Sequence, residues 1–213
     1  MKPITGVILA GGKSSRFGRN KALEPFMGER LIDRSVRLIK EWCDPVFVVC
    51  QKPEEYFGVE ANLVADIIPD QGPLMGLYTG LLFSPNEWIF LRAVDMPFLE
   101  GAFAELLIKR ATEGNADVVV PLKGRHIDLP LEAGRHTDLP LQYEPLCACY
   151  NVRCIPHIKR VIESSGGRVI SFFSRVRVDA VPEDTWRAVD PKGRSILNIN
   201  TIQDMDEVVR ELS

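Results

Sequence analysis

The feature that most constrains the fold is an alternation of short apolar runs with helical patterns over the first 120 residues. The runs are rich in Val, Ile and Leu, as is typical of buried strands. They cover residues 4–9, 46–50, 63–65, 88–94 and 117–121. Apolar residues at helical spacing lie between them, at 31–42, 53–57, 74–83 and 101–111. This alternation predicts an α/β protein, a three-layer α/β/α sandwich whose Rossmann-like, mostly parallel sheet is covered on both faces.

The composition predicts one globular domain. The chain has 213 residues, of which 46% are hydrophobic and 26% charged, so it can bury a substantial core. A formal net charge of −3 gives no global attraction to nucleic acid or to an anionic membrane. No apolar run approaches the roughly 20 residues of a membrane span, and residues 1–3 lead directly into the first run. We therefore expect a cytoplasmic protein with no nucleic-acid and no membrane partner.

The cysteines and histidines do not predict a metal or disulfide site. The five cysteines include no C-x-x-C pair, and the three histidines are not at metal-ligand spacing. We expect each cysteine to be a buried, reduced thiol.

The first apolar run leads into a loop rich in glycine and positive charge, L-A-G-G-K-S-S-R-F-G-R-N-K at 9–21. Glycine lets the backbone approach a ligand, and consecutive N–H groups can form an anion-binding concavity. Lys13, Arg16 and Lys21 add positive charge, so the loop suits a polyphosphate. A glycine turn with solvated cations is the alternative. The loop matches neither the P-loop pattern nor the G-x-G-x-x-G fingerprint.

Two carboxylates follow other strands of the predicted sheet. Ligands bind beyond the carboxyl ends of parallel strands, and the loop, Asp66 and Asp95 all follow such ends. A carboxylate after a buried strand, such as Asp95, is costly unless it is paired or metal-bound. Mg²⁺ prefers one or two carboxylates plus phosphate oxygens. The alternatives are a helix N-cap or turn for Asp95 and a turn for Asp66.

Four ordered motifs resemble those of the molybdenum cofactor guanylyltransferases, the MobA-like family of nucleotidyltransferases with the GT-A-like fold. The motifs are the 9–21 loop, G-P-L-M-G at 72–76, V-D-M-P-F at 94–98 and N-I-N-T at 198–201. This resemblance, which spans almost the whole chain, implies a magnesium-dependent transferase. Its substrates would be GTP and the molybdopterin cofactor, and its products molybdopterin guanine dinucleotide and diphosphate. It also implies transient contacts with other cofactor-biosynthesis proteins or target molybdoenzymes.

The resemblance implies roles for particular residues. The implied nucleotide-binding residues are Leu9, Ala10, Gly11, Gly12, Lys13, Lys21, Asp66 and Asp95. The implied catalytic residues are Arg16, Lys21 and Asp95, with Lys21 offsetting charge on the leaving diphosphate. The implied metal ligands are Asp95 and Asn200, although Asn200 is equally a turn residue beside a helix cap. The family usually carries asparagine where this chain has Cys50, so one nucleotide contact is missing or replaced.

The second half of the chain is expected to bind molybdopterin. We divide the single domain, 1–213, into a nucleotide-binding half at 1–121 and a molybdopterin-binding half at 122–213. The sequence G-R-H-x-D-L-P-L occurs twice within 124–141, which predicts an inserted surface hairpin or, alternatively, a basic flap over an anionic substrate. Further strands are expected at 145–150, 176–181 and 196–200, a helix at 153–164 and a short helix at 169–174. Thr201 should cap a last helix, with Asp204 completing a capping box.

Other functions remain open at this point. No side chain obviously reads the base, so a molybdopterin cytidylyltransferase or a sugar-phosphate nucleotidyltransferase would fit the same scaffold. A regulatory or carrier domain that binds nucleotide without turnover is a third alternative. Arg16, Lys21 and Asp95 argue against it, because binding alone needs no metal carboxylate. The motifs contain glycines, cations and carboxylates but no Ser-His-Asp arrangement, so catalysis would rest on positioning and charge neutralisation.

Overall fold

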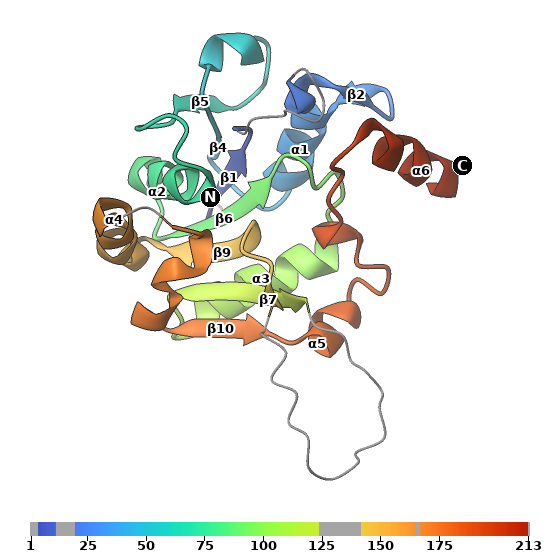
Figure 1. Cartoon of the computed structure of the whole chain (residues 1–213). Coiled ribbons are helices and arrows are strands. Elements are labelled where there is room, and N and C mark those ends of the chain that lie inside the picture. Colours follow the sequence, from blue (N-terminus) through green and yellow to red (C-terminus); the bar gives the residue numbers. More distant parts are fainter. Residues whose placement is uncertain (1–3, 12–19, 124–141, 165–166, 213) are drawn as a thin grey trace.

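The structure is a computed structural model that describes residues 4–11, 20–123, 142–164 and 167–212. Its middle layer is an eight-stranded sheet in the order β10-β7-β9-β6-β1-β4-β5, with β8 beside β7 (Figure 1). The strands of this sheet are β1 (Ile4–Leu9), β4 (Val46–Cys50), β5 (Asn62–Ala65), β6 (Trp88–Ala93), β7 (Val118–Lys123), β8 (Gln142–Tyr143), β9 (Cys147–Asn151) and β10 (Val178–Val181). A separate two-stranded sheet joins β2 (Pro25–Phe26) to β3 (Glu29–Arg30).

The sheet is mostly parallel, as predicted. β1 pairs in parallel with β4 on one side and β6 on the other, whereas β9 runs antiparallel between β6 and β7. Leu9 lies opposite both Val49 and Ala93. The carboxyl ends of β1, β4 and β6 therefore meet at one edge, which places the residues that follow them close together.

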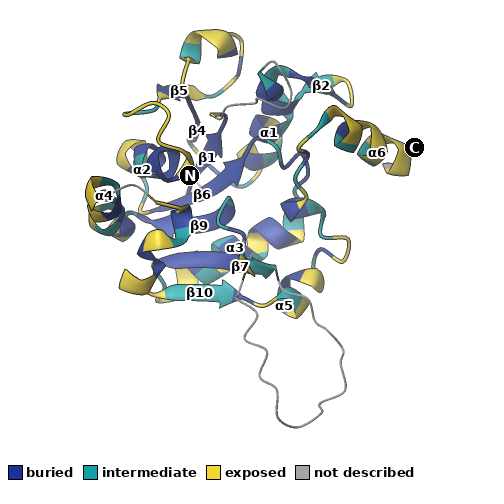
Figure 2. Cartoon of the chain, in the orientation of Figure 1, coloured by how far each residue is buried: buried dark blue, intermediate teal, exposed yellow. Residues whose placement is uncertain are grey.

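Helices cover both faces of the sheet, which gives the expected three layers (Figure 1). Side chains of α1, α3, α5 and α6 belong to one apolar cluster, and those of α2, α4 and η4 belong to the other. Figure 2 shows the inner strands β1, β4, β6, β7 and β9 mostly buried, whereas the edge strand β10 is of intermediate burial. The helices are α1 (Leu31–Lys40), α2 (Pro73–Phe83), α3 (Gly101–Glu113), α4 (Ile155–Ser164), α5 (Glu183–Arg187) and α6 (Ile202–Leu212). Short 3-10 turns are η1 (Lys21–Leu23), η2 (Pro53–Tyr56), η3 (Val152–Cys154), η4 (Val169–Arg175) and η5 (Arg194–Ile196).

Most predicted elements are confirmed, but the expected strand at 196–200 is wrong. That segment begins as η5 and continues as irregular chain. Its backbone N–H groups do not bond to a strand: Leu197 N–H donates to Arg194 O, and Ile199 N–H donates to Asp95 O in the turn after β6. The predicted capping box is present, because Asp204 N–H donates to Thr201 Oγ1 and Thr201 N–H donates to Asp204 Oδ2.

The cysteine prediction is also confirmed, since all five thiols are free and buried. No helix in the described part of the chain has both the length and the apolar character that crossing a bilayer requires.

One sheet carries strands from both sides of residue 121. The assignment of 1–121 to nucleotide and of 122–213 to molybdopterin stays a prediction. The duplicated segment 124–141 lies outside the described residues.

Candidate functional site

A cavity of about 420 Å³ lies at the edge where β1, β4 and β6 end. The chain crosses from β5 to β6 over β4 and β1, so the order of the strands reverses at β1 and this edge is the topological switch point at which open α/β sheets bind ligands. Gly11, Asp66 and Asp95, which the sequence pattern assigned to one crevice, line the same cavity. The other lining residues are Leu9, Val49, Gln51, Asp70, Gly72, Pro73, Gly76, Ala93, Val94 and Leu146.

Lys21 and Asp95 form an ion pair beside the cavity. Lys21 Nζ lies 3.3 Å from Asp95 Oδ2, and the two side chains are 11% and 29% exposed. Lys21 opens η1, whereas Asp95 follows β6, so residues 74 positions apart meet here. The positive charge of Lys21 also contributes to the lowered pKa of Asp204, after the hydrogen bonds from Asn200 and Thr201. Lys21 thus stands among carboxylates at the rim of the site.

Tyr56 holds the two ends of the glycine loop together. Its hydroxyl donates to Ala10 O at 2.7 Å, where the loop begins, and contacts Asn20 Oδ1 at 3.3 Å, where it ends. Asn20 in turn caps η1 by accepting from Ala22 N–H. Tyr56 is buried, which raises its pKa to about 12, so the hydroxyl stays protonated and can donate. This bridge fixes the place of Lys21.

Asp66 lines the cavity and has one buried carboxylate oxygen, Oδ1, without a hydrogen-bond partner among the described residues. Its Oδ2 lies 3.5 Å from the position that a Cβ on Gly11 would occupy. Burial raises the pKa of the Asp66 carboxyl. An acceptor deprived of water and of protein donors is costly, so this oxygen is suited to a ligand donor.

The start of α2 forms one wall of the cavity. Gly72 has φ 75°, a left-handed value that side chains rarely adopt, and Pro73 then opens the helix. Gly76 lies so close to Leu9 that an added Cβ would be 2.9 Å from Leu9 Cδ2. The first turn of a helix carries unpaired N–H groups and a partial positive charge. This wall therefore combines close backbone approach with a favourable place for negative charge.

The residues expected to hold a metal are only partly gathered here. The hydrogen bond from Ile199 N–H to Asp95 O, at 2.9 Å, brings the backbone of Asn200 next to Asp95. The Asn200 side chain is exposed. Among the described residues, no group of three or more His, Cys, Asp or Glu side chains could hold an ion. Such a sparse donor set fits Mg²⁺, which takes few protein carboxylates and completes its shell with phosphate oxygens and water.

The remaining predicted residues fall into two groups. Leu9 and Gly11 line the cavity, and Ala10 is held beside it by Tyr56. Gly12, Lys13 and Arg16 lie outside the described residues. Cys50 does not line the cavity, since its thiol donates to Val64 O and burial raises its pKa to about 11.

Sequence reasoning did not assign several residues to this site, among them Gln51, Tyr56, Asp70 and Leu146. Gln51 lines the cavity one residue after Cys50 and donates to Asp70 Oδ1 at 3.2 Å. Its amide could have been found from its place directly after a buried strand. Tyr56 and Leu146 come from elements whose relation to the loop depends on the tertiary fold, and no sequence signal marks them.

Comparison with known proteins gives consistent results. The "MobA-like NTP transferase domain" family matches residues 6–178. A relative named molybdenum cofactor guanylyltransferase, from Desulfosudis oleivorans, is 35% identical over 208 residues, which is 97% of this chain and 95% of the relative.

Two solved structures share the fold at low sequence identity. One is molybdopterin-guanine dinucleotide biosynthesis protein A from Archaeoglobus fulgidus, with a TM-score of 0.77 and 22% identity over 97% of this chain and 99% of that one. The other is 4-diphosphocytidyl-2C-methyl-D-erythritol synthase from Anaerococcus prevotii, with a TM-score of 0.68 and 14% identity over 98% and 97%. Because these identities are low, the likenesses concern the fold, which is that of GT-A-like nucleotidyltransferases.

Proposed function

Because this chain belongs to the MobA-like NTP transferase family, we propose that it transfers GMP from GTP to the molybdenum-molybdopterin cofactor. The terminal phosphate of molybdopterin attacks the α-phosphorus of GTP, the bond to the β-phosphate breaks, and diphosphate leaves. The observation that carries the proposal is one cavity at the switch point of the sheet, lined by Gly11, Asp66 and Asp95 with Lys21 at its rim. The close relative from Desulfosudis oleivorans bears the name of this activity.

The residues act by positioning and charge neutralisation. Phosphate is already an anion, so its attack needs little help from a general base. Lys21 exchanges its bond to Asp95 for contacts with the diphosphate, where it offsets the charge that develops. Lys13 and Arg16, from the loop that precedes Lys21, provide further positive charge that offsets the negative charge of the diphosphate. We expect the nucleotide to contact the backbone of Leu9, Ala10, Gly11 and Gly12, and the two glycines have no side chain to hinder its approach.

Asp95 and Asn200 are the residues proposed to hold Mg²⁺. When bound, Mg²⁺ supplies charge neutralisation between the carboxylate and the triphosphate. Without ligand, Lys21 provides the positive charge beside Asp95, and Mg²⁺ would provide it once Lys21 contacts the diphosphate. The five free cysteines support a reducing, cytoplasmic setting.

Asp66 is proposed to read the base. An ionised carboxylate only accepts hydrogen bonds, and it can accept two in parallel. The N1–H and 2-amino groups of guanine present two neighbouring donors, whereas cytosine presents its amino group beside an acceptor. The unsatisfied Asp66 Oδ1 therefore favours GTP over CTP. The family usually carries an asparagine where this chain has Cys50. The amide of Gln51, which lines the same cavity, is proposed to make the contact of that asparagine.

Diphosphate release tests the activity and separates it from the alternatives. We would measure release with each of the four nucleoside triphosphates, with and without molybdopterin. The proposal expects release from GTP alone, and only when molybdopterin is present. Release with CTP would indicate the cytidylyltransferase. Release with a sugar phosphate but not with molybdopterin would indicate the sugar-phosphate enzyme, and nucleotide binding without release would indicate a carrier domain.

Asp66→Asn tests the base-reading role. ITP lacks the 2-amino group, so the wild-type protein should prefer GTP over ITP by about tenfold or more, the value of one lost hydrogen bond to a charged group. The variant replaces one acceptor with a donor and should lose most of that preference by raising the KM for GTP. Gln51→Leu is the matched control, because it removes an amide from the same cavity. An Asp66→Asn protein with an unchanged GTP-to-ITP ratio would remove Asp66 from base recognition.

A further inference from the structure

In the turn that follows β6, every backbone carbonyl accepts a hydrogen bond from a residue outside the turn. The turn covers residues 94–98 and contains Asp95. The donors are Ser35 Oγ to Val94 O, Ile199 N–H to Asp95 O, Arg92 Nη2 to Met96 O, Arg34 Nε to Pro97 O and Arg92 Nη2 to Phe98 O. A turn with so many bonds has little freedom to move.

Arg92 is the centre of this arrangement. It lies on β6 with 1% of its surface exposed, on the same face of the sheet as Phe90. Its Nη2 donates to Met96 O at 2.9 Å and Phe98 O at 2.6 Å. Its Nη1 donates to Ser195 O at 3.3 Å and contacts Cys147 Sγ at 3.1 Å. One guanidinium therefore bonds both the turn that bears Asp95 and the segment that leads to Asn200.

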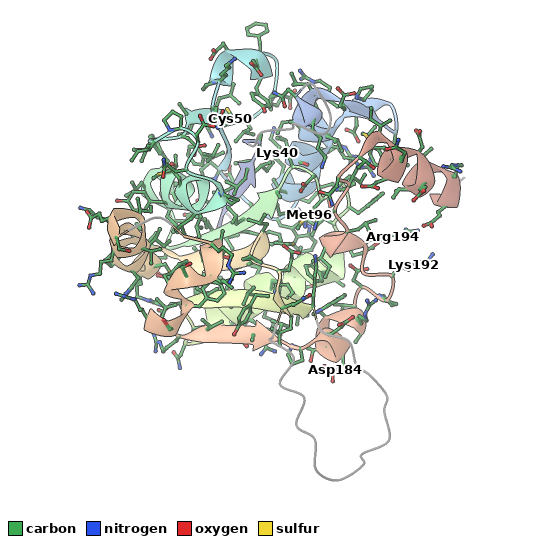
Figure 3. All side chains as sticks on the ribbon, viewed as in Figure 1. Lys40, Cys50, Met96, Asp184, Lys192 and Arg194 are labelled. Atoms are coloured by element: carbon green, nitrogen blue, oxygen red, sulfur yellow. The ribbon has the colours of Figure 1, made fainter. Side chains whose placement is uncertain are left out.

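The second segment is held by bonds within itself and by one bond to Glu100. Asp190, 1% exposed, accepts from Arg194 N–H at 3.0 Å and from Ser195 N–H at 2.8 Å. Ser195 Oγ accepts from Glu100 N–H at 3.0 Å. In Figure 3, Met96 and Arg194 mark the two segments, which lie side by side. The arrangement joins chain regions about a hundred residues apart.

A buried arginine with these partners is expensive. All four acceptors are neutral, three carbonyls and one thiol, so they offset the cost of burying the charge only in part. An apolar side chain would fill the same space at lower cost, as Phe90 does two residues earlier. The fork of five N–H donors is what only arginine provides, because it can bond several separate carbonyls at once.

We propose that Arg92 is a positioning residue that sets Asp95 and Asn200 beside each other and so preforms the Mg²⁺–triphosphate subsite. This inference rests on the proposed function for the identity of the ligand. It deepens that function by assigning the preorganisation of the metal site to a residue that touches neither metal nor nucleotide. Groups that orient metal ligands from behind typically change metal affinity about 10- to 100-fold when altered.

Two variants test the inference, and a third serves as control. Arg92→Lys keeps the charge but cannot bond both segments with one planar fork. Ser195→Ala removes only the bond to Glu100 N–H, so it gives a milder form of the same change if Arg92→Lys folds poorly. Arg110→Lys is the matched control, because Arg110 bonds Asp179 through a similar fork between α3 and β10, away from the cavity.

The first measurement is amide hydrogen exchange in the free protein, which needs no ligand. The inference expects faster exchange in peptides covering residues 94–100 and 190–201 in both Arg92→Lys and Ser195→Ala, with other core strands unchanged. Arg110→Lys should leave these two peptides as in the wild type. Unchanged exchange in both site variants would overturn the positional link, whatever the enzyme proves to do.

The second measurement is calorimetric binding of the α,β-methylene analogue of GTP, which cannot be cleaved at the reacting bond. We would compare its affinity in Mg²⁺ and in EDTA. In Arg92→Lys, the ratio of the affinity in Mg²⁺ to the affinity in EDTA should be about tenfold smaller than in the wild type. The affinity in EDTA should stay near the wild-type value. A full Mg²⁺ gain in Arg92→Lys would overturn the inference. A wild-type protein without any Mg²⁺ gain would instead contradict the proposed function, and exchange would still decide the positional link.

Discussion

At the residue scale, the ion pair between Lys21 and Asp95 is the most informative contact in the site. A triphosphate brings several negative charges to this edge of the sheet, and an unscreened carboxylate would repel them. Lys21 Nζ lies 3.3 Å from Asp95 Oδ2, and Lys21 is mostly buried whereas the Asp95 side chain is partly exposed at the rim. The chain thus keeps a carboxylate where an anionic ligand is expected, which makes sense if a cation lies between them during the reaction.

Asp95→Asn separates the metal role from a purely structural role in the turn, since the N-cap of the following helix α3 is Glu100 and not Asp95. Asparagine keeps the size of the side chain, so a structural role in the turn predicts little change. The metal role predicts a loss of turnover on the order of 10²-fold or more and a higher Mg²⁺ requirement. Melting without nucleotide should change little. Steady-state rates across a Mg²⁺ series and thermal melts on the same sample are the measurements.

Asp70→Asn is the control for this change. Asp70 lines the same cavity, but on the side of Gln51 rather than Lys21. The Asp70→Asn variant removes the same charge from the cavity but leaves Asp95, the proposed metal ligand, unchanged. Equal losses of turnover in both variants would mean that the total charge of the cavity matters. They would contradict a metal-binding role specific to Asp95.

At the scale of single elements, α2 shows how a helix is brought against a strand by glycine. Gly76 and Gly80 are one turn apart on the face that packs on β1. Added Cβ atoms would lie 2.9 Å from Leu9 Cδ2 and 2.7 Å from Val7 Cγ1, respectively. Leu9 lines the cavity, whereas Val7 is fully buried on a central strand. The two glycines therefore serve the site and the core separately.

Gly76→Ala and Gly80→Ala should have opposite consequences. The end of the Leu9 side chain can rotate, and alanine favours a helix by up to about 1 kcal/mol over glycine, so Gly76→Ala should keep its melting temperature. Leu9 would then turn into the cavity and raise the KM for GTP. Val7 is β-branched and enclosed, so Gly80→Ala should destabilise by about 1–3 kcal/mol with an unchanged KM. Denaturant titration and initial rates on both variants test this, and a Gly76→Ala protein with a normal KM would contradict it.

The elements also show what the sequence could and could not predict. Strands such as β4 and β6 were predictable because a continuous apolar run is itself the signal for a buried strand. The segment at 196–200 also carries three apolar residues in five, yet its N–H groups bond elsewhere: Ile199 N–H donates to Asp95 O, and Asn200 N–H donates to Asp204 Oδ2, so the segment never joins the sheet. Tertiary bonds decided its structure, and no local pattern reveals them.

At the scale of the whole molecule, the site was predictable only where topology placed it. The rule that ligands bind beyond strand ends was enough to bring Gly11, Asp66 and Asp95 together in advance. Tyr56 and Arg92 act across 46 and up to 103 positions, respectively, and their roles depend on which chain segments become neighbours. A single sequence gives no access to such pairings.

The far half of the sheet depends on one carboxylate, which leads to a prediction about acid stability. Asp117 precedes β7 and bonds Arg153 Nε at 2.7 Å and Arg177 Nε at 3.3 Å. Burial by itself would raise the Asp117 pKa, but the hydrogen bonds from Arg177 and Arg153 outweigh it and lower the pKa to about 2. These bonds join the ends of β7, β9 and β10, so losing them should loosen three strands together.

The sign of the pH effect follows from the lowered pKa. The unfolded chain has its ordinary Asp117 pKa of 3.8, so above that value the folded state has the full benefit of the ionised carboxylate. The benefit disappears as the pH falls from about 4 to about 2. We expect Asp117→Asn to lower the free energy of unfolding at pH 7 by on the order of 1–2 kcal/mol, since both arginines are partly exposed and screened. Urea titrations of both proteins at several pH values should show this difference shrinking toward pH 2, and a difference that stays constant would show that Asp117 acts through packing rather than charge.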